Sequence, residues 1–566
     1  MKKKILVVKI VVIIICLLFF TFSITTLKTD NNSIKSFISE NTQSYLPVFP
    51  GAEGFGTNTR AAYAGDIEPV VYKVTNLNEN GPGSLRKALT ASEPRIVVFE
   101  VSGYINLSPD KNDSRFSLFI KNPYLYVAGQ TAPSPGITII GTIVIETHDV
   151  VFQHLRIRPG DLPSGSDYEY RDCIDAHNFV AGNIYNIVFD HLSLSWGTDE
   201  LSNTWYDTKN ITYQYCIFSE ALHSTLHPKG RHSCALAIGP DSRNNSIHHN
   251  LFAHCAGRTP LVEPAGYTEF INNVVYNWEY VASDFIDYPY EPYVCTNPGP
   301  KFCNIIGNFY KSGPSTIDEV AILINKDKPP SKFFIHDNIG PWRTTNLMND
   351  WDIVYGDIEL KSESPTFPSS RISTQSALDT YDHVLKNAGA RPQDRDLVDN
   401  RIIKEVKDRT GMIIESQKQV GGWPTLEKNY RKLNIPNNPH EDDNKNGYTN
   451  LEEWLHEYSK NVELKDTNLA PNKPVKPLGP KSILVGRLYN FETLTHDPEN
   501  NQVYYLFDWG DGTNSGWIGP FNSSENIITN KSWGKNGEYI VKSKAKDIFG
   551  KQSKWSNGLL VSTNSD

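Results

Sequence analysis

The chain has 566 residues and a formal net charge of −9. Such a length predicts roughly three or four domains, and an aromatic content of 11% is ample for large buried cores. The mild acidity argues against a general nucleic-acid-binding protein, which would carry a basic excess. It does not exclude an anionic polysaccharide as partner, because a local basic patch or a bound cation is enough to hold one.

The first residues have the pattern of a targeting segment. Three lysines at positions 2–4 precede an almost wholly apolar run over residues 10–22, as in a secretory signal. We expect residues 1–27 to be either a cleaved signal peptide of a secreted protein or a retained N-terminal anchor at the cell surface, because the apolar run could nearly span a bilayer. Residues 28–46 are polar and rich in Ser and Asn, which predicts a linker.

From residue 124 onward, short apolar strands recur without helices between them, from LYVAG and ITIIG to NIIGN and FFIHDN. A polar residue recurs at the end of these strands every 23–36 residues, at His154, Asp190, Gln214, Asn250, Asn273, Asn308 and Asn338. Periods of about 20–50 residues indicate solenoids, whereas a sandwich would show tighter hairpins. We therefore predict an all-β fold, a right-handed parallel β-helix over residues 47–460 with these polar residues stacked as a ladder at one corner.

The end of this domain carries helical patterns. Residues 376–389 and 396–411 have helical periodicity and end on glycine, so we expect a helical tail packed over the β-helix. The sequence EDDNKNGYTNLEEW follows, and its residues 442–453 match the spacing of an EF-hand calcium loop. The predicted ligands of this second metal site are Asp442, Asn444, Asn446, Tyr448 through its carbonyl, Asn450 and Glu453. A polar turn that caps a helix is the alternative.

The C-terminal part has the composition of a separate module. Residues 461–481 are rich in Pro and Asn, as in a linker. Residues 482–566 alternate like strands, and the stretches FDWGDGTNSGW and GEYIVKSKAKDIFGKQSKWS resemble PKD or Ig-like β-sandwich domains. The resemblance implies a module that acts as a spacer or contacts carbohydrate rather than one that catalyses.

Six cysteines follow the apolar run, and the sequence contains no CxxC pair, so a zinc knuckle is not indicated. Cys295 and Cys303 bracket a Pro/Gly loop and could pair. The others lie on or beside predicted strands, and we expect them to be small buried apolar groups.

Charged residues of four successive repeats could share one cleft. Asp199 and Asn203 lie in the turn DELSN and could face one hard cation together with Asp172. Oxygen ligands of this kind favour Ca²⁺ over zinc. Residues one rung apart in a β-helix lie about 4.8 Å apart, so Lys229 and Arg258 can join them and bind an anionic polymer. A surface charge network is the alternative.

Several motifs in the repeat region resemble those of the pectate lyases of the parallel β-helix type. They are AGQTAPSPGITIIG, LRIRPGD, RDCIDA, NIVFDHLSLSWGTDELSN, HPKG, HHNLFAHCAGRTP and INNVVYNW, spread over residues 48–310. The resemblance implies that Asp172, Asp199 and Asn203 hold calcium, although the family usually has Asp where this chain has Asn203. It further implies that Arg258 is the catalytic arginine.

The same resemblance assigns substrate-binding residues. Lys229 falls on the lysine that binds the substrate carboxylate, and the nearby Arg231 and His227 are further candidates. The family commonly has a second arginine shortly after the first, but this chain has Leu261 and Glu263 in that stretch. Some carboxylate binding must therefore come from elsewhere, and Arg231 is placed to supply it.

The resemblance implies a secreted, monomeric pectate lyase that cleaves α-1,4-galacturonan (pectate, or homogalacturonan) by calcium-assisted β-elimination, with an arginine as base. Two alternatives stay open. One is a galacturonan hydrolase on the same fold, which needs close carboxyl pairs such as Asp172 with Asp175 or Asp199 with Glu200. The other is a non-catalytic polysaccharide-binding surface protein.

Overall fold

The computed structural model describes residues 46–107, 116–161, 171–177, 184–223, 227, 230–263, 265–286, 299–325, 330–463, 469–498, 502–547 and 551–565. The predicted targeting segment and nearly all of the first linker lie outside these residues. Within them, none of the helices combines the length and apolarity that a membrane crossing needs.

Three long parallel sheets dominate the described residues before position 360. The ten-stranded sheet contains β1 (Val70–Val74), β2 (Arg95–Phe99), β5 (Leu125–Ala128), β8 (Val150–Gln153), β11 (Tyr185–Asp190), β14 (Lys209–Gln214), β17 (Arg243–His248), β20 (Gly266–Ile271), β23 (Lys301–Ile306) and β26 (Lys332–His336). The nine-stranded sheet contains β4 (Ser117–Ile120), β7 (Thr142–Ile145), β10 (Ile174–His177), β13 (Glu200–Trp205), β16 (Cys234–Ile238), β19 (Leu261–Val262), β22 (Val281–Ile286), β25 (Val320–Asn325) and β27 (Val354–Gly356). The eight-stranded sheet contains β3 (Gly103–Asn106), β6 (Ile137–Ile140), β9 (Arg156–Ile157), β12 (Ser193–Ser195), β15 (Ile217–Ser219), β18 (Leu251–Ala253), β21 (Val274–Tyr276) and β24 (Phe309–Lys311).

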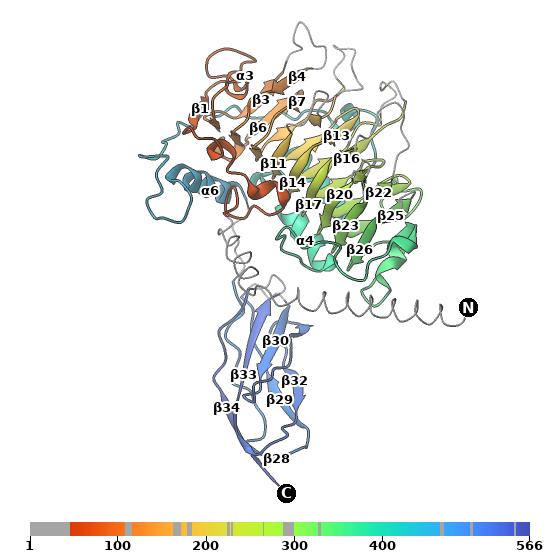
Figure 1. The fold of residues 1–566 in the computed structure, drawn as a ribbon, viewed down its shortest axis with the longest axis vertical. Coiled ribbons are helices and arrows are strands. Elements are labelled where there is room, and N and C mark those ends of the chain that lie inside the picture. The colour runs from red at the N-terminus through yellow and green to blue at the C-terminus, as the bar shows by residue number, and fades with distance from the viewer. Residues whose placement is uncertain are drawn as a thin grey trace, which may run out of the picture. The chain divides into compact units, whose positions relative to one another are not determined.

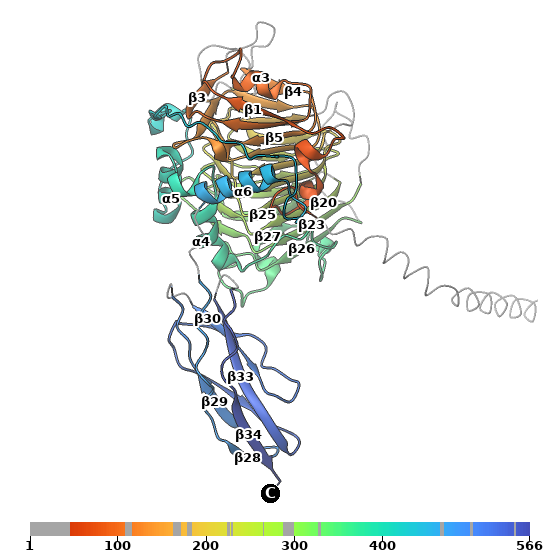
Figure 2. The ribbon, with the colours of Figure 1, turned by 90° about the vertical axis from the view of Figure 1, so that its left-hand side faces the viewer.

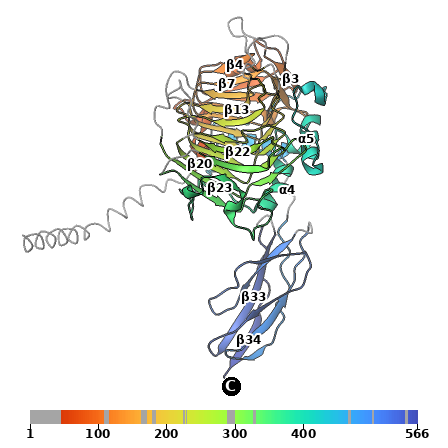
Figure 3. The same cartoon turned by 90° about the vertical axis from the view of Figure 1, so that its right-hand side faces the viewer.

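Consecutive strands of the repeat region enter the three sheets in turn, so each set of three makes one rung of a coil. In the ten-stranded sheet, Ile187 pairs in parallel register with Ile211, and Ile211 pairs with Asn245 of the next rung. The colour order in Figure 1 and the stacked strands β7, β13 and β22 in Figure 3 show that the rungs follow one another in chain order along the axis of the coil. The fold is a parallel β-helix, as the strand repeats predicted.

The interior of the coil is a continuous apolar column. Side chains such as Val127, Phe152, Phe189, Phe218 and Phe252 are fully buried in one cluster that runs through the rungs. Phe218 and Phe252 stack with their ring centroids 4.7 Å apart. Burying such side chains contributes about 1.5–3 kcal/mol each, which explains why short β-branched and aromatic strands are enough to build each rung.

A ladder of asparagines lines the corner between the ten- and eight-stranded sheets. Asn273 Oδ1 accepts hydrogen bonds from the main-chain N of Asn250 at 2.9 Å and from its Nδ2 at 3.0 Å. Asn308 Oδ1 does the same for Asn273 at 2.8 and 3.0 Å, and Asn338 Oδ1 for Asn308 at 3.0 and 2.8 Å. All four residues are buried, so the predicted scaffold role of these asparagines is confirmed.

The predicted ladder is wrong for its first three members. The strand register places Asp190 opposite Gln153 and Gln214, and Gln214 opposite His248, two residues before Asn250. Asp190 accepts hydrogen bonds from Gln153 Nε2 and Gln214 Nε2, each at 2.7 Å, in a separate row. The sequence could not show this difference, because the alternation of apolar and polar residues along a strand does not fix the residue at which the corner begins.

We expect Asn273→Ala to lower the free energy of unfolding by about 3 kcal/mol, because it leaves buried amides of the ladder without partners at about 1–3 kcal/mol each. Urea denaturation measures this. Asn400→Ala is the control, since Asn400 is exposed on a helix of the tail and its loss should change stability by less than about 0.5 kcal/mol. Equal, small effects of both substitutions would contradict a structural ladder.

The helices are few and short in the described residues. The α-helices are α3 (Leu85–Leu89), α4 (Ala377–Asn387), α5 (Leu397–Asp408) and α6 (Asn450–Val462). The 3₁₀ helices are η1 (Phe55–Asn58), η2 (Ala61–Tyr63), η3 (Gly129–Thr131), η5 (Asp350–Ile353), η6 (Ile358–Leu360), η7 (Pro392–Asp394) and η8 (Gln417–Val420). Ser376, Asp396 and Thr449 cap the N-termini of α4, α5 and α6 with their side chains, which is the usual use of such residues.

The helical tail covers two outer faces of the coil, as expected (Figure 2). Val384 of α4 and Ile402 of α5 pack in one apolar cluster with Leu251 of the eight-stranded sheet. Leu451 and Leu455 of α6 pack with the outward side chains of the ten-stranded sheet. The outer face of the nine-stranded sheet carries the charged residues of the candidate site.

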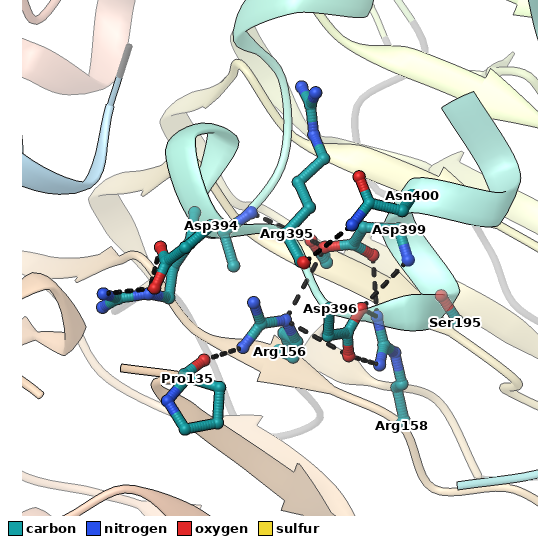
Figure 4. Close-up of polar contacts among 12 residues, drawn as sticks. Pro135, Arg156, Arg158, Ser195, Asp394, Arg395, Asp396, Asp399 and Asn400 are labelled. Carbon is teal, nitrogen blue, oxygen red and sulfur yellow. Dashed lines mark hydrogen bonds and ion pairs between the residues drawn. The ribbon is translucent and has the colours of Figure 1, made fainter. Parts of the chain in front are cut away.

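A buried ion network attaches the start of α5 to the coil (Figure 4). Arg158 Nη1 lies 2.5 Å from Asp396 Oδ2, and its Nη2 lies 2.7 Å from Asp399 Oδ1. Arg156 Nε lies 3.5 and 3.6 Å from the same two carboxylates. These four side chains are at most 1% exposed. The motif LRIRPGD therefore supplies arginines that dock the tail, which sequence reasoning did not anticipate.

The C-terminal residues form two antiparallel-rich sheets of their own. One contains β28 (Ser482–Leu484), β34 (Leu559–Asn564), β33 (Gly537–Asp547), β30 (Val503–Asp508) and β31 (Ile518–Phe521), and the other β29 (Tyr489–Thr493) and β32 (Ile527–Lys531). Phe491, Trp509 and Trp533 pack at their shared core. The small β-sandwich agrees with the strand pattern of the sequence.

Cys173, Cys216 and Cys255 are buried free thiols, as expected for small apolar groups of the core. Burial raises the pKa of the Cys216 thiol above its usual value. Cys303 is also buried. Its suggested partner Cys295 lies outside the described residues, so the pairing stays a prediction.

Candidate active site

Three carboxylates from two rungs converge on the nine-stranded sheet. Asp172 lies just before β10, Asp199 just before β13, and Glu200 is the first residue of β13. One carboxylate oxygen from each lies within 4.8 Å of the others. Asp172 and Glu200 are buried, and the Asp199 side chain is 15% exposed. The structure thus brings together the carboxylates of Asp172 and Asp199, adds Glu200, and places the third predicted calcium ligand, Asn203, in contact with Asp172.

Local backbone geometry holds this cluster in place. Asp172 Oδ1 accepts a hydrogen bond from the Glu200 main-chain N at 2.9 Å, which ties the two rungs together. A Cβ on Gly197 would lie 2.4 Å from the Glu200 carbonyl oxygen, so only glycine fits at this point of the turn. Asn203 lies one strand over from Asp175 in register, and its Nδ2 donates to Asp172 Oδ2 at 2.5 Å.

The charges of the cluster call for a cation. Burial, with the nearby charges of Asp199 and Asp175, holds the pKa of Asp172 well above its usual value. In addition, Asn203 Oδ1 and Asp175 Oδ1 are buried oxygens without a hydrogen-bond partner in the described residues. Carboxylate and amide oxygens are the ligands that Ca²⁺ takes, so the residues present fit such an ion.

Two histidines stand behind Asp199. His232 Nε2 lies 2.6 Å and His227 Nε2 3.6 Å from Asp199 Oδ1, and the two rings stack with centroids 4.3 Å apart. Burial alone would raise the pKa of Asp199, but the two imidazoles outweigh it and hold the pKa below its usual value. His232 was not predicted, although it directly follows the motif HPKGR. The His227 side chain is fully buried, so it faces the carboxylate.

Arg258 reaches the edge of the same cluster. It lies between β18 and β19, and its carbonyl accepts from Leu236 N at 2.8 Å. Its Nη1 forms an ion pair with Glu200 Oε1, and its side chain is 29% exposed. The arginine is therefore held by an acid two rungs earlier in the coil and remains partly open to solvent, so a substrate can reach it.

The side of Arg258 away from the cluster is acidic. Leu261 of β19 is buried, and Asp284 pairs with it in register on β22. Burial, only partly offset by Arg258, raises the pKa of Asp284 to about 7. In the stretch where the family commonly has a second arginine, this chain therefore has the buried Leu261, with the Asp284 carboxyl group beside it on the next strand.

Of the two other predicted substrate-binding residues, Arg231 contacts the tail instead of the acidic cluster. Lys229 lies outside the described residues. Arg231 is 62% exposed and pairs with Glu415 of the tail at 3.2 Å. The sequence could not predict this ion pair, because Arg231 and Glu415 are far apart along the chain.

In the predicted EF-hand-like loop, the proposed ligand side chains hydrogen-bond to one another and to the loop backbone. Glu453 Oε1 accepts hydrogen bonds from Asn444 Nδ2 and Asn446 Nδ2, both at 2.7 Å. Asp442 Oδ2 accepts from Gly447 N at 2.8 Å, and Gly447 has a φ of 96°, which glycine adopts readily. The predicted ligand side chains of Asp442, Asn444, Asn446 and Glu453 are therefore linked by hydrogen bonds within the loop, and α6 begins where the motif requires a helix.

The fold and the site together define a class of protein. It is a parallel β-helix with an acidic cluster that fits a cation, and an arginine beside it, on the outer face of the nine-stranded sheet. No family model matches the chain. The chain is 32% identical over 394 residues to "Probable pectate lyase C" from Aspergillus fumigatus, covering 67% of this chain and 82% of that protein. A relative of the same name from Neosartorya fischeri is 33% identical over 392 residues, with the same coverage.

Among solved structures, the pectate lyase pelN from Paenibacillus sp. 0602 is 12% identical, with a TM-score of 0.38 over 62% of this chain and 98% of that one. The identity and coverage of the fungal relatives establish the family. The chain belongs to the pectate lyases and is a polysaccharide lyase.

Proposed function

We propose that the chain is an exported enzyme that cleaves α-1,4-linked galacturonan by calcium-assisted β-elimination. The observation that carries this proposal is the meeting of Asp172, Asp199 and Glu200 beside Arg258 on the open sheet. The relatives, named as pectate lyases, support pectate as the substrate. An exported chain also agrees with the pattern of residues 1–27.

Asp172, Asp199 and Glu200 are the ligands we propose for Ca²⁺, with Asn203 as a fourth through its free amide oxygen. Calcium bound there supplies positive charge next to the uronate carboxylate, which makes the neighbouring C5 proton more acidic. His227 and His232 keep Asp199 oriented toward the cluster. Lys229 and Arg231 bind substrate carboxylates in this proposal.

Arg258 is the proposed base. In its neutral form it takes the C5 proton, the electron pair forms the C4–C5 double bond, and the C4–O bond breaks with its electrons on the leaving oxygen, which takes a proton from water. Glu200 is a positioning residue, because its carboxylate holds the guanidinium at the edge of the cluster. The partial burial of Arg258 limits competing contact with water.

The hydrolase alternative needs a pair of carboxyl groups, which stand about 5–5.5 Å apart in retaining glycosidases and about 6.5–9.5 Å apart in inverting ones. In this chain one carboxylate oxygen from each of Asp172, Asp199 and Glu200 lies within 4.8 Å of the others. Three converging carboxylates suit a shared cation, which favours the lyase.

Mass spectrometry of the products tests the proposed reaction. Elimination conserves the mass of the polymer at each cut, whereas hydrolysis adds one water per cut. We expect oligomers without added water when pectate and Ca²⁺ are mixed with the full chain. Products heavier by water would establish a hydrolase, and binding of pectate without any products would establish a non-catalytic surface protein.

The C-terminal sandwich is the proposed contact with cell-wall polysaccharide. Lys544 lies 5.5 Å from the ring of Trp517 and 5.2 Å from that of Trp555, and Lys546 lies 4.8 Å from Trp517. Aromatic rings pack on sugar faces, and lysines pair with uronate carboxylates. The two lysines of β33, with Trp517 and Trp555 packed against them, suit an anionic polymer, and we propose that the enzyme acts on it as a monomer.

The EF-hand-like loop is the proposed second calcium site. With Ca²⁺ at about 100 times its dissociation constant, we expect the free energy of unfolding to rise by about 2.7 kcal/mol. Glu453→Gln should remove most of this gain, because Glu453 is the side chain on which the loop converges. Thermal unfolding with and without Ca²⁺ measures it.

Asp443→Asn is the matched control, because Asp443 lies in the same loop but at a position that supplies no ligand. It should keep the calcium-dependent gain. If Glu453→Gln also keeps the full gain, the loop is only a polar turn that caps α6.

A further inference from the structure

A second cluster of metal-ligating side chains lies outside the candidate active site. His154, Asp190, His191 and Glu463 each offer one ligand atom, and these atoms all lie within 4.8 Å of one another. The first three come from two successive rungs at the end of β8 and of β11, and Glu463 follows the last residue of α6. Figure 2 shows α6 alongside the ten-stranded sheet to which these strands belong. The cluster therefore joins the coil to its tail.

One contact of His154 indicates which nitrogen of its ring carries the proton. Its Nδ1 lies 2.9 Å from the carbonyl oxygen of Ala390, and a carbonyl can only accept, so Nδ1 carries a proton. The neutral ring then presents the lone pair of Nε2 to the cluster. A metal-binding histidine nearly always donates its other ring N–H to a carbonyl or carboxylate in this way.

The Nε2 atom of His154 lacks an ordinary partner. It is fully buried and makes no hydrogen bond of acceptable geometry within the described residues. Its nearest carboxylate oxygen, Glu463 Oε1, lies 3.2 Å away. Two ligands of one tetrahedral ion stand roughly 3.3 Å apart at bond lengths near 2.0–2.1 Å, so the separation fits a shared ion.

Hydrogen bonds from neighbouring side chains orient the carboxylate of Asp190. Gln153 Nε2 and Gln214 Nε2 each donate to it at 2.7 Å, and His191 Nδ1 lies 2.9 Å from Asp190 Oδ1. The two glutamine hydrogen bonds are of the kind that fix ligating carboxylates in metal sites. His154 and His191 also stack, with ring centroids 4.9 Å apart, which restrains both imidazoles.

We propose that His154, His191, Asp190 and Glu463 form a site for one divalent transition-metal ion of the zinc class, which clamps the end of α6 to the corner of the coil. Two imidazole and two carboxylate ligands suit zinc and its neighbours, whereas calcium takes oxygen ligands. The Glu463 side chain is 32% exposed, which leaves an entry path for the ion. This site is separate from the acidic cluster beside Arg258.

Cobalt(II) titration of the metal-stripped full chain tests the site, since cobalt in zinc sites absorbs in the visible range. The titration is done in a His232→Gln background, because His227 and His232 also stand beside a carboxylate. We expect one equivalent of Co²⁺ to produce the absorption and Zn²⁺ to abolish it. We also expect Zn²⁺ to raise the Tm of the chain.

Glu463→Gln should weaken cobalt binding at least about tenfold, as losses around metal ligands do, and remove the zinc-dependent rise in Tm. Glu457→Gln is the matched control, because Glu457 is an exposed carboxylate on the same helix, paired with Lys460, and it should change neither reading. Absence of stoichiometric absorption, or equal binding by Glu463→Gln and Glu457→Gln, would overturn the proposal and leave an ion-pair network in its place.

Discussion

Arg258→Lys should lower kcat on pectate by about 10²–10⁴-fold, the contribution typical of a positioned general base, with a much smaller change in KM. Lysine offers a single nitrogen at a different position from the guanidinium nitrogens, so it changes the geometry of proton removal more than the binding of the substrate. Initial rates of product formation at saturating Ca²⁺ measure the effect.

The control for this substitution is Arg86→Ala. Arg86 lies in α3, its side chain is 23% exposed, and it pairs with Glu79 at 4.0 Å, so its loss leaves the acidic cluster and Arg258 unchanged. It should leave the rate unchanged. A folded Arg258→Lys enzyme with wild-type kcat would show that another group removes the proton.

Asp172→Asn should raise the Ca²⁺ concentration needed for half-maximal activity by about 100-fold or more, because even residues behind metal ligands change affinity by about 10–100-fold. High calcium should restore part of the activity, which separates this variant from Arg258→Lys. Calcium titrations of the initial rate, with calorimetric titration of binding, give both values.

Stability provides an internal check on Asp172→Asn. Burial and two neighbouring carboxylates raise the pKa of Asp172, so its charge costs free energy when no cation is bound. The variant should therefore unfold no earlier than wild type in chelator. Asp207→Asn, at an exposed carboxylate paired with Lys209, should leave calcium dependence unchanged. An unaltered calcium requirement in Asp172→Asn would place the activating ion elsewhere.

The fold was predictable because each rung repeats a local pattern. Short apolar strands, their spacing and the buried asparagines Asn250, Asn273 and Asn308 all depend on neighbours within one rung of the chain. Asp190 was misplaced, because rungs differ in length and the sequence does not show at which residue a corner begins. The strand register that separates Asp190 from Asn250 appears only in three dimensions.

The site was predictable in part. The family motifs mark Asp172 and Asp199, and the structure brings their carboxylates together, while their role as calcium ligands stays a prediction. Glu200 was named only as a hydrolase candidate, since its pairing with Arg258 joins residues 58 apart in sequence. Contacts made by the tail, such as that of Glu463 with His154, escape any local pattern because they depend on how α6 docks.

The most direct test of the central claim is the ultraviolet absorbance of unsaturated uronate during reaction of the full chain with pectate. We predict that absorbance rises in proportion to enzyme with Ca²⁺ present, stops on addition of a chelator and resumes when Ca²⁺ is restored. Accumulation of new reducing ends without absorbance, or an equal rise in chelator, would contradict calcium-assisted elimination at the acidic cluster beside Arg258.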